Sequence, residues 1–331
     1  MVRIAANAAT TLGAAYRQPT LVERSMCTIM TYHLLKLFSR LISLLPYRAV
    51  LFLGRMLGPV YARVAGRQRK RALEQLQESL GVGPAEAERI IDSLFVKLGQ
   101  TFLEVMYMPA LTPAKAEQYI TIENRHYLDA ALQEGKGVVL LTAHIGNWEW
   151  LGAVLAMAGL PLTTVIKRQP NDQHTRILNE YRENAGIEVF ARGSSELVGA
   201  AKALKKGKIL GFLADQDAGE SGIALPFLGK LASTPMGPAV FAKRFHSPVV
   251  PAFIVRQPQG GHRVLLYEPF YYQDTGNEDR DIYELTLKMT QITEEVIRTY
   301  PDEWLWFQKR WNTKIDNHEV PKSPPMAGEA I

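Results

Sequence analysis

Cysteine is nearly absent from this chain of 331 residues, which contains only Cys27. A single cysteine excludes a disulfide framework within the chain and favours a reducing compartment. No histidine and acid pattern surrounds Cys27, so we do not expect it to serve as a catalytic nucleophile. Internal repeats are also missing, which excludes solenoid and propeller architectures.

The chain lacks a long uncharged apolar run as well. From Ser25 to Ala65 it is rich in Leu, Met and aromatic residues, but five basic residues and two prolines interrupt this segment: Lys36, Arg40, Arg48, Arg55, Arg63, Pro46 and Pro59. A spanning helix needs about 20 mainly apolar residues, so none is predicted. Apolar residues at helical spacing, with basic residues between them, are typical of amphipathic helices that lie in a membrane interface. A helical hairpin packed on the following domain is the alternative.

Basic residues continue after this segment with Arg67, Arg69, Lys70 and Arg71, a cluster suited to anionic headgroups. The net charge of +5 and the isoelectric point near 9.1 also favour an anionic partner, such as an acidic protein, a phosphorylated saccharolipid or an anionic bilayer. The apolar content of 47% is that of a globular chain, which excludes disordered and collagen-like classes.

The two ends predict little structure. Residues Met1 to Arg24 lack the apolar core of a signal peptide, and Met26 or Met30 is an alternative start. We therefore expect a loose extension over 1–29, a helical membrane-associating region over 30–110 and a larger domain over 111–315. Residues 316–331 contain three prolines and few large apolar residues, which predicts a disordered tail.

The segment Gly137 to Trp150, with the sequence GVVLLTAHIGNWEW, is the most informative part of the chain. Its continuous apolar run predicts a central strand covered on both faces, which ends just before His144. Asn147 is a good N-cap for a helix beginning at Trp148, and Glu149 then lies at the favourable end of the helix dipole. A carboxylate that fixes one imidazole nitrogen leaves the other free to act as a base, so we expect His144 and Glu149 to meet.

Apolar strand patterns alternate with helix patterns through the rest of the chain. We predict strands over 119–123, 162–167, 187–191, 209–214, 249–255 and 264–267, and helices over 71–80, 85–106, 126–134, 173–184 and 195–205. This alternation predicts an α/β fold with a mostly parallel central sheet flanked by helices.

Several ordered blocks resemble a known family. They are His144 to Glu149, Asp215 to Asp217, Gly222, Pro226 to Gly229 with Thr234, and the tryptophan-rich stretch 304–311. The chain is similar from about Thr31 to Lys314 to the bacterial lipid A late acyltransferases, within the lysophospholipid acyltransferase superfamily. The resemblance implies a glycerol-phosphate acyltransferase-like fold, a His144 base with Glu149 as partner, and no cofactor or metal. Glutamate at 149 favours the lipid A branch, because the glycerol-phosphate branch more often has aspartate there.

The same resemblance implies the reaction and its setting. A fatty acyl group passes from an acyl carrier protein thioester, with coenzyme A as the alternative donor, to a hydroxyl of a lipid A precursor. We expect a direct transfer without an acyl-enzyme at the cytoplasmic face of the inner membrane, and no nucleic-acid partner. A lysophospholipid, a glycosylated lipid or an ornithine-type lipid is an alternative acceptor. A catalytically silent lipid-binding protein on the membrane surface is the alternative from another class.

Further residues are predicted to bind substrate. Arg168 and Asn171 follow a strand that we expect to end at the same edge of the sheet as His144, and they match the family's second block. Either Lys167 or Arg168 suits a phosphate group. Asp215 and Asp217 follow another strand, and within the superfamily an acid of this region orients the histidine in some members. The sequence leaves open whether Glu149 or Asp215 does so here. The pair supplies too few ligands for a strong metal site.

Two later segments complete the predictions. Gly222 lies in a loop whose small residues would let an acyl chain or a sugar approach, or that is an ordinary surface loop. Near the C-terminus, tryptophans alternate with Lys309 and Arg310, which predicts either a second membrane contact or a buried packing segment.

Overall fold

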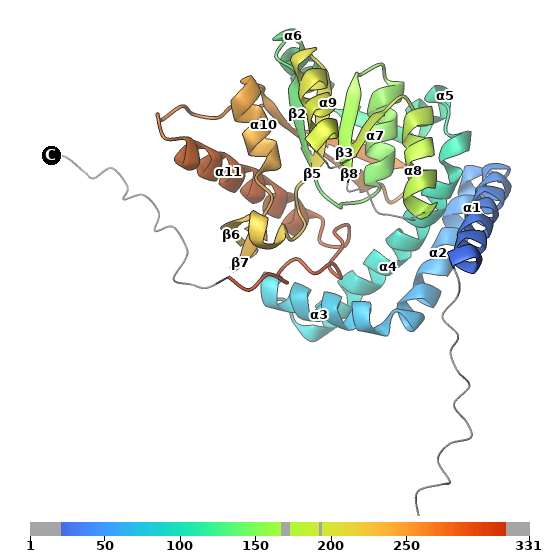
Figure 1. Cartoon of the computed structure of the whole chain (residues 1–331). Coiled ribbons are helices and arrows are strands. Elements are labelled where there is room, and N and C mark those ends of the chain that lie inside the picture. The colour runs from blue at the N-terminus through green and yellow to red at the C-terminus, as the bar shows by residue number, and fades with distance from the viewer. Residues whose placement is uncertain (1–20, 167–172, 192–193, 316–331) are drawn as a thin grey trace, which may run out of the picture.

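A seven-stranded sheet forms the centre of the computed structural model, which describes residues 21–166, 173–191 and 194–315 (Figure 1). The strand order is β1-β9-β8-β2-β5-β3-β4. Within this sheet the one antiparallel pair among the described strands is β8 with β9, so β1 and β9 run against the other five strands. The predicted α/β class with a mostly parallel sheet is confirmed. The strands are β1 Ile120–Glu123, β2 Val138–Thr142, β3 Leu162–Ile166, β4 Glu188–Ala191, β5 Ile209–Leu213, β8 Val249–Arg256 and β9 His262–Leu266.

The central strand β2 is buried on both faces, as its continuous apolar run predicts. Val138 and Leu140 pack into one core, and Val139 and Leu141 pack into another on the opposite face of the sheet. This alternation follows from the period of two in a strand.

Helices cover each face of the sheet (Figure 1). Residues of α6 Arg125–Gln133, α7 Trp148–Met157 and α8 Gln173–Asn184 belong to the core that contains Leu140. Residues of α9 Ser194–Lys205, α10 Gly237–Phe245 and α11 Glu278–Thr299 belong to the core that contains Leu141. The short α5 Pro113–Tyr119 precedes β1, and the 3₁₀ turns η1 Met108–Ala110 and η2 Gly219–Ser221 complete the list. The sheet is therefore enclosed, and its strand ends are the places left for a site.

The loop expected around Gly222 and Pro226 contains an antiparallel hairpin, so the sequence interpretation was incomplete there. Strand β6 Ile223–Phe227 pairs with β7 Lys230–Thr234 through a two-residue turn. Leu228 and Gly229 in this turn both have positive φ, 48° and 82°, as the twist of a tight hairpin favours. The hairpin was missed because Leu228 is a poor residue for such a turn.

Four helices form a layer beside the sheet domain: α1 Leu21–Ser43, α2 Tyr47–Val64, α3 Gly66–Leu80 and α4 Pro84–Tyr107 (Figure 1). Pro46 separates α1 from α2 and Pro84 begins α4, as the sequence suggests. The expectation that Pro59 also interrupts the helical run was wrong, because α2 continues through it. Pro59 is exposed, so water can bond the carbonyl that it leaves without an N–H donor. None of the described helices has the length and apolarity that crossing a bilayer requires.

Glycines bring α2 and α4 into backbone contact. A Cβ on Gly58 would lie 2.2 Å from the Phe95 carbonyl oxygen, and a Cβ on Gly99 would lie 2.3 Å from that of Gly54. A side chain at these positions would push the two helices apart, so the sequence requires glycine there.

Candidate active site

His144 lies two residues beyond the carboxyl end of β2, where the chain turns sharply into α7. Gly146 makes this turn possible with a φ of 59°, and its Cα approaches the Ile254 carbonyl so closely that a Cβ would lie 2.1 Å from it. The predicted strand, turn and helix are therefore all present, with Asn147 as the N-cap of α7. We call the residues 144–147 the His144 turn.

The carboxylate that holds the His144 ring is Asp215. His144 Nδ1 lies 2.8 Å from Asp215 Oδ1, and the His144 backbone N–H donates to Oδ2 over 3.1 Å. Strands β2 and β5 explain the contact, because Val138 pairs with Ile209, 71 positions later, and Asp215 also follows His144 by 71. With Nδ1–H donating to Asp215, the Nε2 atom is left without a proton and can accept one.

Asp215 is fully buried and satisfied by hydrogen-bond donors. Besides His144, its Oδ2 accepts from Trp304 Nε1 at 2.8 Å and from Gln308 Nε2 at 3.1 Å. Burial acts to raise the pKa of Asp215, but the charge of the His144 imidazolium and these hydrogen bonds hold it well below its usual range. Burial likewise acts to lower the pKa of His144, and the Asp215 carboxylate outweighs burial and raises it.

Glu149 is engaged elsewhere, so the expected hydrogen bond between His144 and Glu149 is not formed in this structure. Arg182 of α8 donates from Nε to Glu149 Oε2 over 2.8 Å and from Nη2 to Oε1, a bidentate pair. Glu149 still influences the imidazole, because its negative charge adds to that of Asp215 in raising the pKa of His144. The physical reason for the difference is geometric: α8 packs on α7 and presents a guanidinium to the carboxylate.

The predicted substrate-binding residues are distributed unevenly. Asn147 is fully buried and donates to Glu104 of α4, so its side chain faces the interior. Asp217 accepts from the Thr313 hydroxyl at 2.8 Å. Gly222 allows the hairpin to close, since a Cβ there would lie 2.1 Å from Ser233 Oγ. Arg168 and Asn171 lie outside the described residues.

Two cavities are lined by neighbours of the His144 ring. A polar cleft of about 280 Å³ is lined by Gln216, Asp217, Gln308, Lys309, Arg310 and Asn312. Gln216 connects it to the ring, because its amide nitrogen lies 3.4 Å from His144 Nε2. The Trp148 ring packs edge-on against His144 at 4.9 Å and lines a mainly apolar cavity of about 60 Å³. The remaining lining of that cavity includes Leu140, Leu151, Leu162, Ile187, Gly211 and Leu213, together with the charged Glu149 and Arg182.

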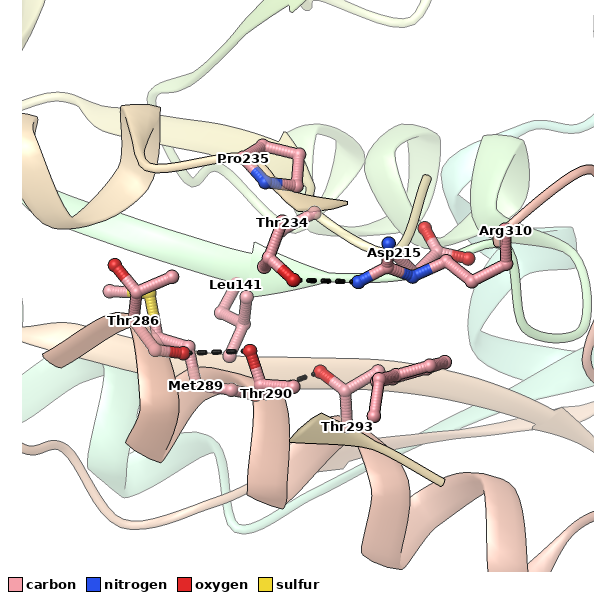
Figure 2. Close-up of a pocket in the computed structure, with 11 residues that line it drawn as sticks. Leu141, Asp215, Thr234, Pro235, Thr286, Met289, Thr290, Thr293 and Arg310 are labelled. Carbon is pink, nitrogen blue, oxygen red and sulfur yellow. Dashed lines mark hydrogen bonds between the residues drawn. The ribbon is translucent and has the colours of Figure 1, made fainter. Parts of the chain in front are cut away.

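A third, smaller cavity of about 10 Å³ is lined in part by Asp215 and Arg310 (Figure 2). Figure 2 shows Arg310 approaching the Thr234 hydroxyl, to which its Nη2 donates over 2.8 Å. Arg310 is 1% exposed and forms no salt bridge with a described carboxylate, and burial lowers its pKa to about 10. Its charge therefore reinforces the ionised state of Asp215.

Trp304 and Trp306 of the C-terminal tryptophan stretch form a buried packing segment, which is the second of the two predicted alternatives. Trp304 and Trp306 are fully buried, and their rings pack edge to face at 4.7 Å. This segment also supplies Gln308, so it closes one wall of the site. Neither Arg182 nor Gln308 was singled out from the sequence. Arg182 could have been noticed, because the predicted 173–184 helix adjoins the helix of Glu149.

Comparisons with known proteins agree on the chemistry. The family model described as "Bacterial lipid A biosynthesis acyltransferase" matches residues 19–313. The chain is 27% identical to the phosphatidylinositol mannoside acyltransferase of Mycolicibacterium smegmatis, over 72% of this chain and 79% of that protein. It is 23% identical to the lipid A biosynthesis palmitoleoyltransferase and 24% identical to the lipid A biosynthesis lauroyltransferase of Escherichia coli, in each case over 82% of this chain and 87% of the relative. The chain belongs to the bacterial lipid A biosynthesis acyltransferase family and is an acyltransferase with a lipid acceptor.

Proposed function

We propose that this enzyme transfers a fatty acyl group from an acyl carrier protein thioester to a hydroxyl of a lipid A precursor. The observation that carries the proposal is the His144 ring, with Nδ1 bonded to a buried carboxylate and Nε2 beside a cleft. This arrangement suits a general base that acts on an alcohol.

In the proposed reaction His144 Nε2 removes the proton of the acceptor hydroxyl while that oxygen attacks the thioester carbonyl carbon. The carbon–sulfur bond then breaks, and the leaving thiolate takes the proton from the imidazolium, which yields an ester and a thiol. Asp215 stabilises the imidazolium through its hydrogen bond, and Glu149 does so through its charge. Backbone N–H groups at the start of α7 are suited to stabilise the oxyanion.

The two cavities suggest how the substrates are divided. The apolar cavity beside Trp148 suits the fatty chain of the donor. The polar cleft beside Gln216 suits the hydroxyl-rich headgroup of the acceptor, and Lys309 suits an anionic substituent on it. A glycosylated phospholipid is the second candidate acceptor, because the mannoside acyltransferase matches this chain.

The decisive experiment compares wild-type protein with His144→Ala, using purified acyl carrier protein thioester and lipid A precursor. Loss of general base action should reduce the rate by about 10²- to 10⁴-fold. A His144→Ala variant that retains the wild-type rate would show the base assignment to be wrong. Replacing the donor with the coenzyme A thioester, or the acceptor with a phosphatidylinositol mannoside, tests the identity of each substrate.

Membrane binding at the cytoplasmic face of the inner membrane is part of the proposal. Exposed apolar residues gather on α1 and α2, among them Leu34, Leu37, Leu41, Phe52, Met56 and Val60. Exposed arginines lie between them at Arg40, Arg48 and Arg55, where each contributes about 1 kcal/mol near an anionic surface. Phe52→Glu should reduce sedimentation with anionic vesicles, whereas the same change at exposed Val198 of α9 should not. Equal sedimentation of both variants would contradict this surface.

A further inference from the structure

A buried carboxylate that the proposed reaction does not use lies on α4. Glu104 is fully buried and accepts hydrogen bonds from four side chains. Tyr47 donates over 2.7 Å, Asn147 over 2.9 Å, Arg256 over 2.7 and 2.8 Å to the two oxygens, and His262 Nε2 lies 3.1 Å from both. Every donor comes from a different element, so Glu104 is one of the points at which the helical layer joins the sheet domain.

Glu104 is ionised despite its burial. Burial acts to raise its pKa, but the charges of Arg256 and His262 and their hydrogen bonds lower it well below the usual value. A buried carboxylate of this kind is a poor source of net stability compared with apolar packing. Stability alone therefore does not explain why a carboxylate is buried at this position.

Asn147 links Glu104 to the His144 turn. Its Oδ1 accepts from the Trp150 backbone N–H at 3.1 Å, and its Nδ2 donates to Glu104. Trp150 adds a second link, because its indole Nε1 donates to the Glu104 carbonyl over 3.0 Å. The first turn of α7 begins four residues after His144. It is held by the Glu104 side chain through Asn147 and by the Glu104 backbone carbonyl through Trp150.

A second contact from α4 reaches the same turn. The Gly146 N–H donates to the Glu303 carbonyl over 2.9 Å. Lys97 of α4 forms a salt bridge with the Glu303 carboxylate at 2.7 Å. Helix α4 therefore supports residues 146 and 147 at two points.

We propose that Glu104 is a positioning residue for His144 and acts through Asn147. The inference rests on the proposed function, since it assigns the helical layer a part in holding the base. In this proposal Asn147 orients the His144 turn and does not contact the substrate.

The test compares one substitution at two helix caps. Asn147→Ser keeps an oxygen that can cap α7 and removes the donor to Glu104. Asn277→Ser makes the same change at the exposed N-cap of α11, where the side chain also accepts a backbone N–H, from Arg280. We expect kcat to fall about 10- to 100-fold for Asn147→Ser with KM within about twofold, because a misplaced base slows the chemical step. Asn277→Ser should retain wild-type kcat.

A double-mutant cycle separates positioning from a purely structural role. Glu104→Gln should lower both stability and kcat, since it leaves Arg256 without its ion pair. If Glu104 acts on catalysis through Asn147, the variant that combines Glu104→Gln with Asn147→Ser should have a kcat no lower than that of the less active single variant. Losses that multiply would overturn the inference, as would wild-type kcat for Asn147→Ser.

Hydrogen exchange provides a readout that does not need substrate. The backbone amides over 144–150 should exchange faster in Asn147→Ser than in wild-type protein, and those of Asn277→Ser should match the wild type there. Unchanged exchange in Asn147→Ser would overturn the inference even in a protein found inactive. An inactive wild-type protein with the expected exchange difference would instead contradict the proposed function.

Discussion

Asp215 and Glu149 are buried carboxylates that both raise the pKa of the same imidazole, yet their surroundings differ. Asp215 accepts from the His144 ring, an indole and an amide, and no described cation forms a salt bridge with it apart from that histidine. Glu149 is bound in a bidentate pair by Arg182. A carboxylate whose charge is neutralised by a guanidinium stabilises the positive charge of a neighbouring imidazolium less. The comparison teaches that the partner of the histidine is decided less by nearness in sequence than by which carboxylate is not already paired with another group.

Removing the Asp215 charge should have the largest effect. Asp215→Asn keeps the shape but favours the wrong tautomer of His144, so kcat should fall by about 10³- to 10⁴-fold. Glu149→Gln should cost much less, because Glu149 makes no hydrogen bond to the ring. Steady-state transfer rates at one pH measure both. A Glu149→Gln loss as large as that of Asp215→Asn would reverse the comparison.

Removing the partner of Glu149 should affect stability. Arg182→Met leaves a buried carboxylate unpaired, which should lower the free energy of unfolding by about 3 kcal/mol. Urea denaturation measures this change. Glu149→Gln combined with Arg182→Met should recover much of the loss, and a double variant as unstable as Arg182→Met would show that the pair is not the cause.

The pH dependence of kcat/KM should distinguish the two carboxylates by size of effect. His144 must be neutral to act as a base, so activity should be lost when the pH falls below the pKa of His144. That pKa is raised, so the loss should occur at a pH above the ordinary histidine value of about 6.5. Removing a negative charge lowers that pKa and moves the acid limb to lower pH. Asp215→Asn should move the limb further than Glu149→Gln, because Asp215 also bonds the ring. An acid limb that stays in place in both variants would mean that another group titrates.

The smallest effects should separate the donor side from the acceptor side. Gly211 lines the apolar cavity, and a Cβ there would meet only ordinary contacts, so Gly211→Ala should fill space that a fatty chain would use. One methyl group corresponds to about 0.8 kcal/mol, or about fourfold in preference toward shorter thioesters. Asn312→Ala in the polar cleft should instead raise the acceptor KM by about fivefold, as for one lost hydrogen bond. Competition assays with mixed thioesters, and acceptor titrations, measure the two quantities. A change of chain preference in Asn312→Ala would contradict the division.

Local patterns predicted most of the sheet and the position of His144. The run Val138 to Leu141 identified the central strand, and Asn147 identified the start of the following helix. Both signals are local, since an apolar strand and a capping side chain act over a few residues. The hairpin over 223–234 was missed because its turn contains Leu228 where a smaller residue is expected.

Long-range partners were beyond the reach of such patterns. The choice between Glu149 and Asp215 depends on the register of β2 against β5, which no stretch of sequence encodes by itself. The contact between His262 and Glu104 joins residues 158 positions apart, so no local pattern predicts it. The family resemblance supplied the reaction class, and the geometry supplied the neighbours of each charged group.

The glycine contact between α2 and α4 has a mechanical consequence. No side chain separates the two backbones at Gly58 and Gly99, so neither helix can slide or tilt without carrying the other. Helix α2 bears exposed Phe52 and Met56, while α4 bears Glu104. The two helices should therefore move as one rigid unit. This unit exposes Phe52 and Met56 on its outer side, and on its inner side it contacts the turn that contains His144.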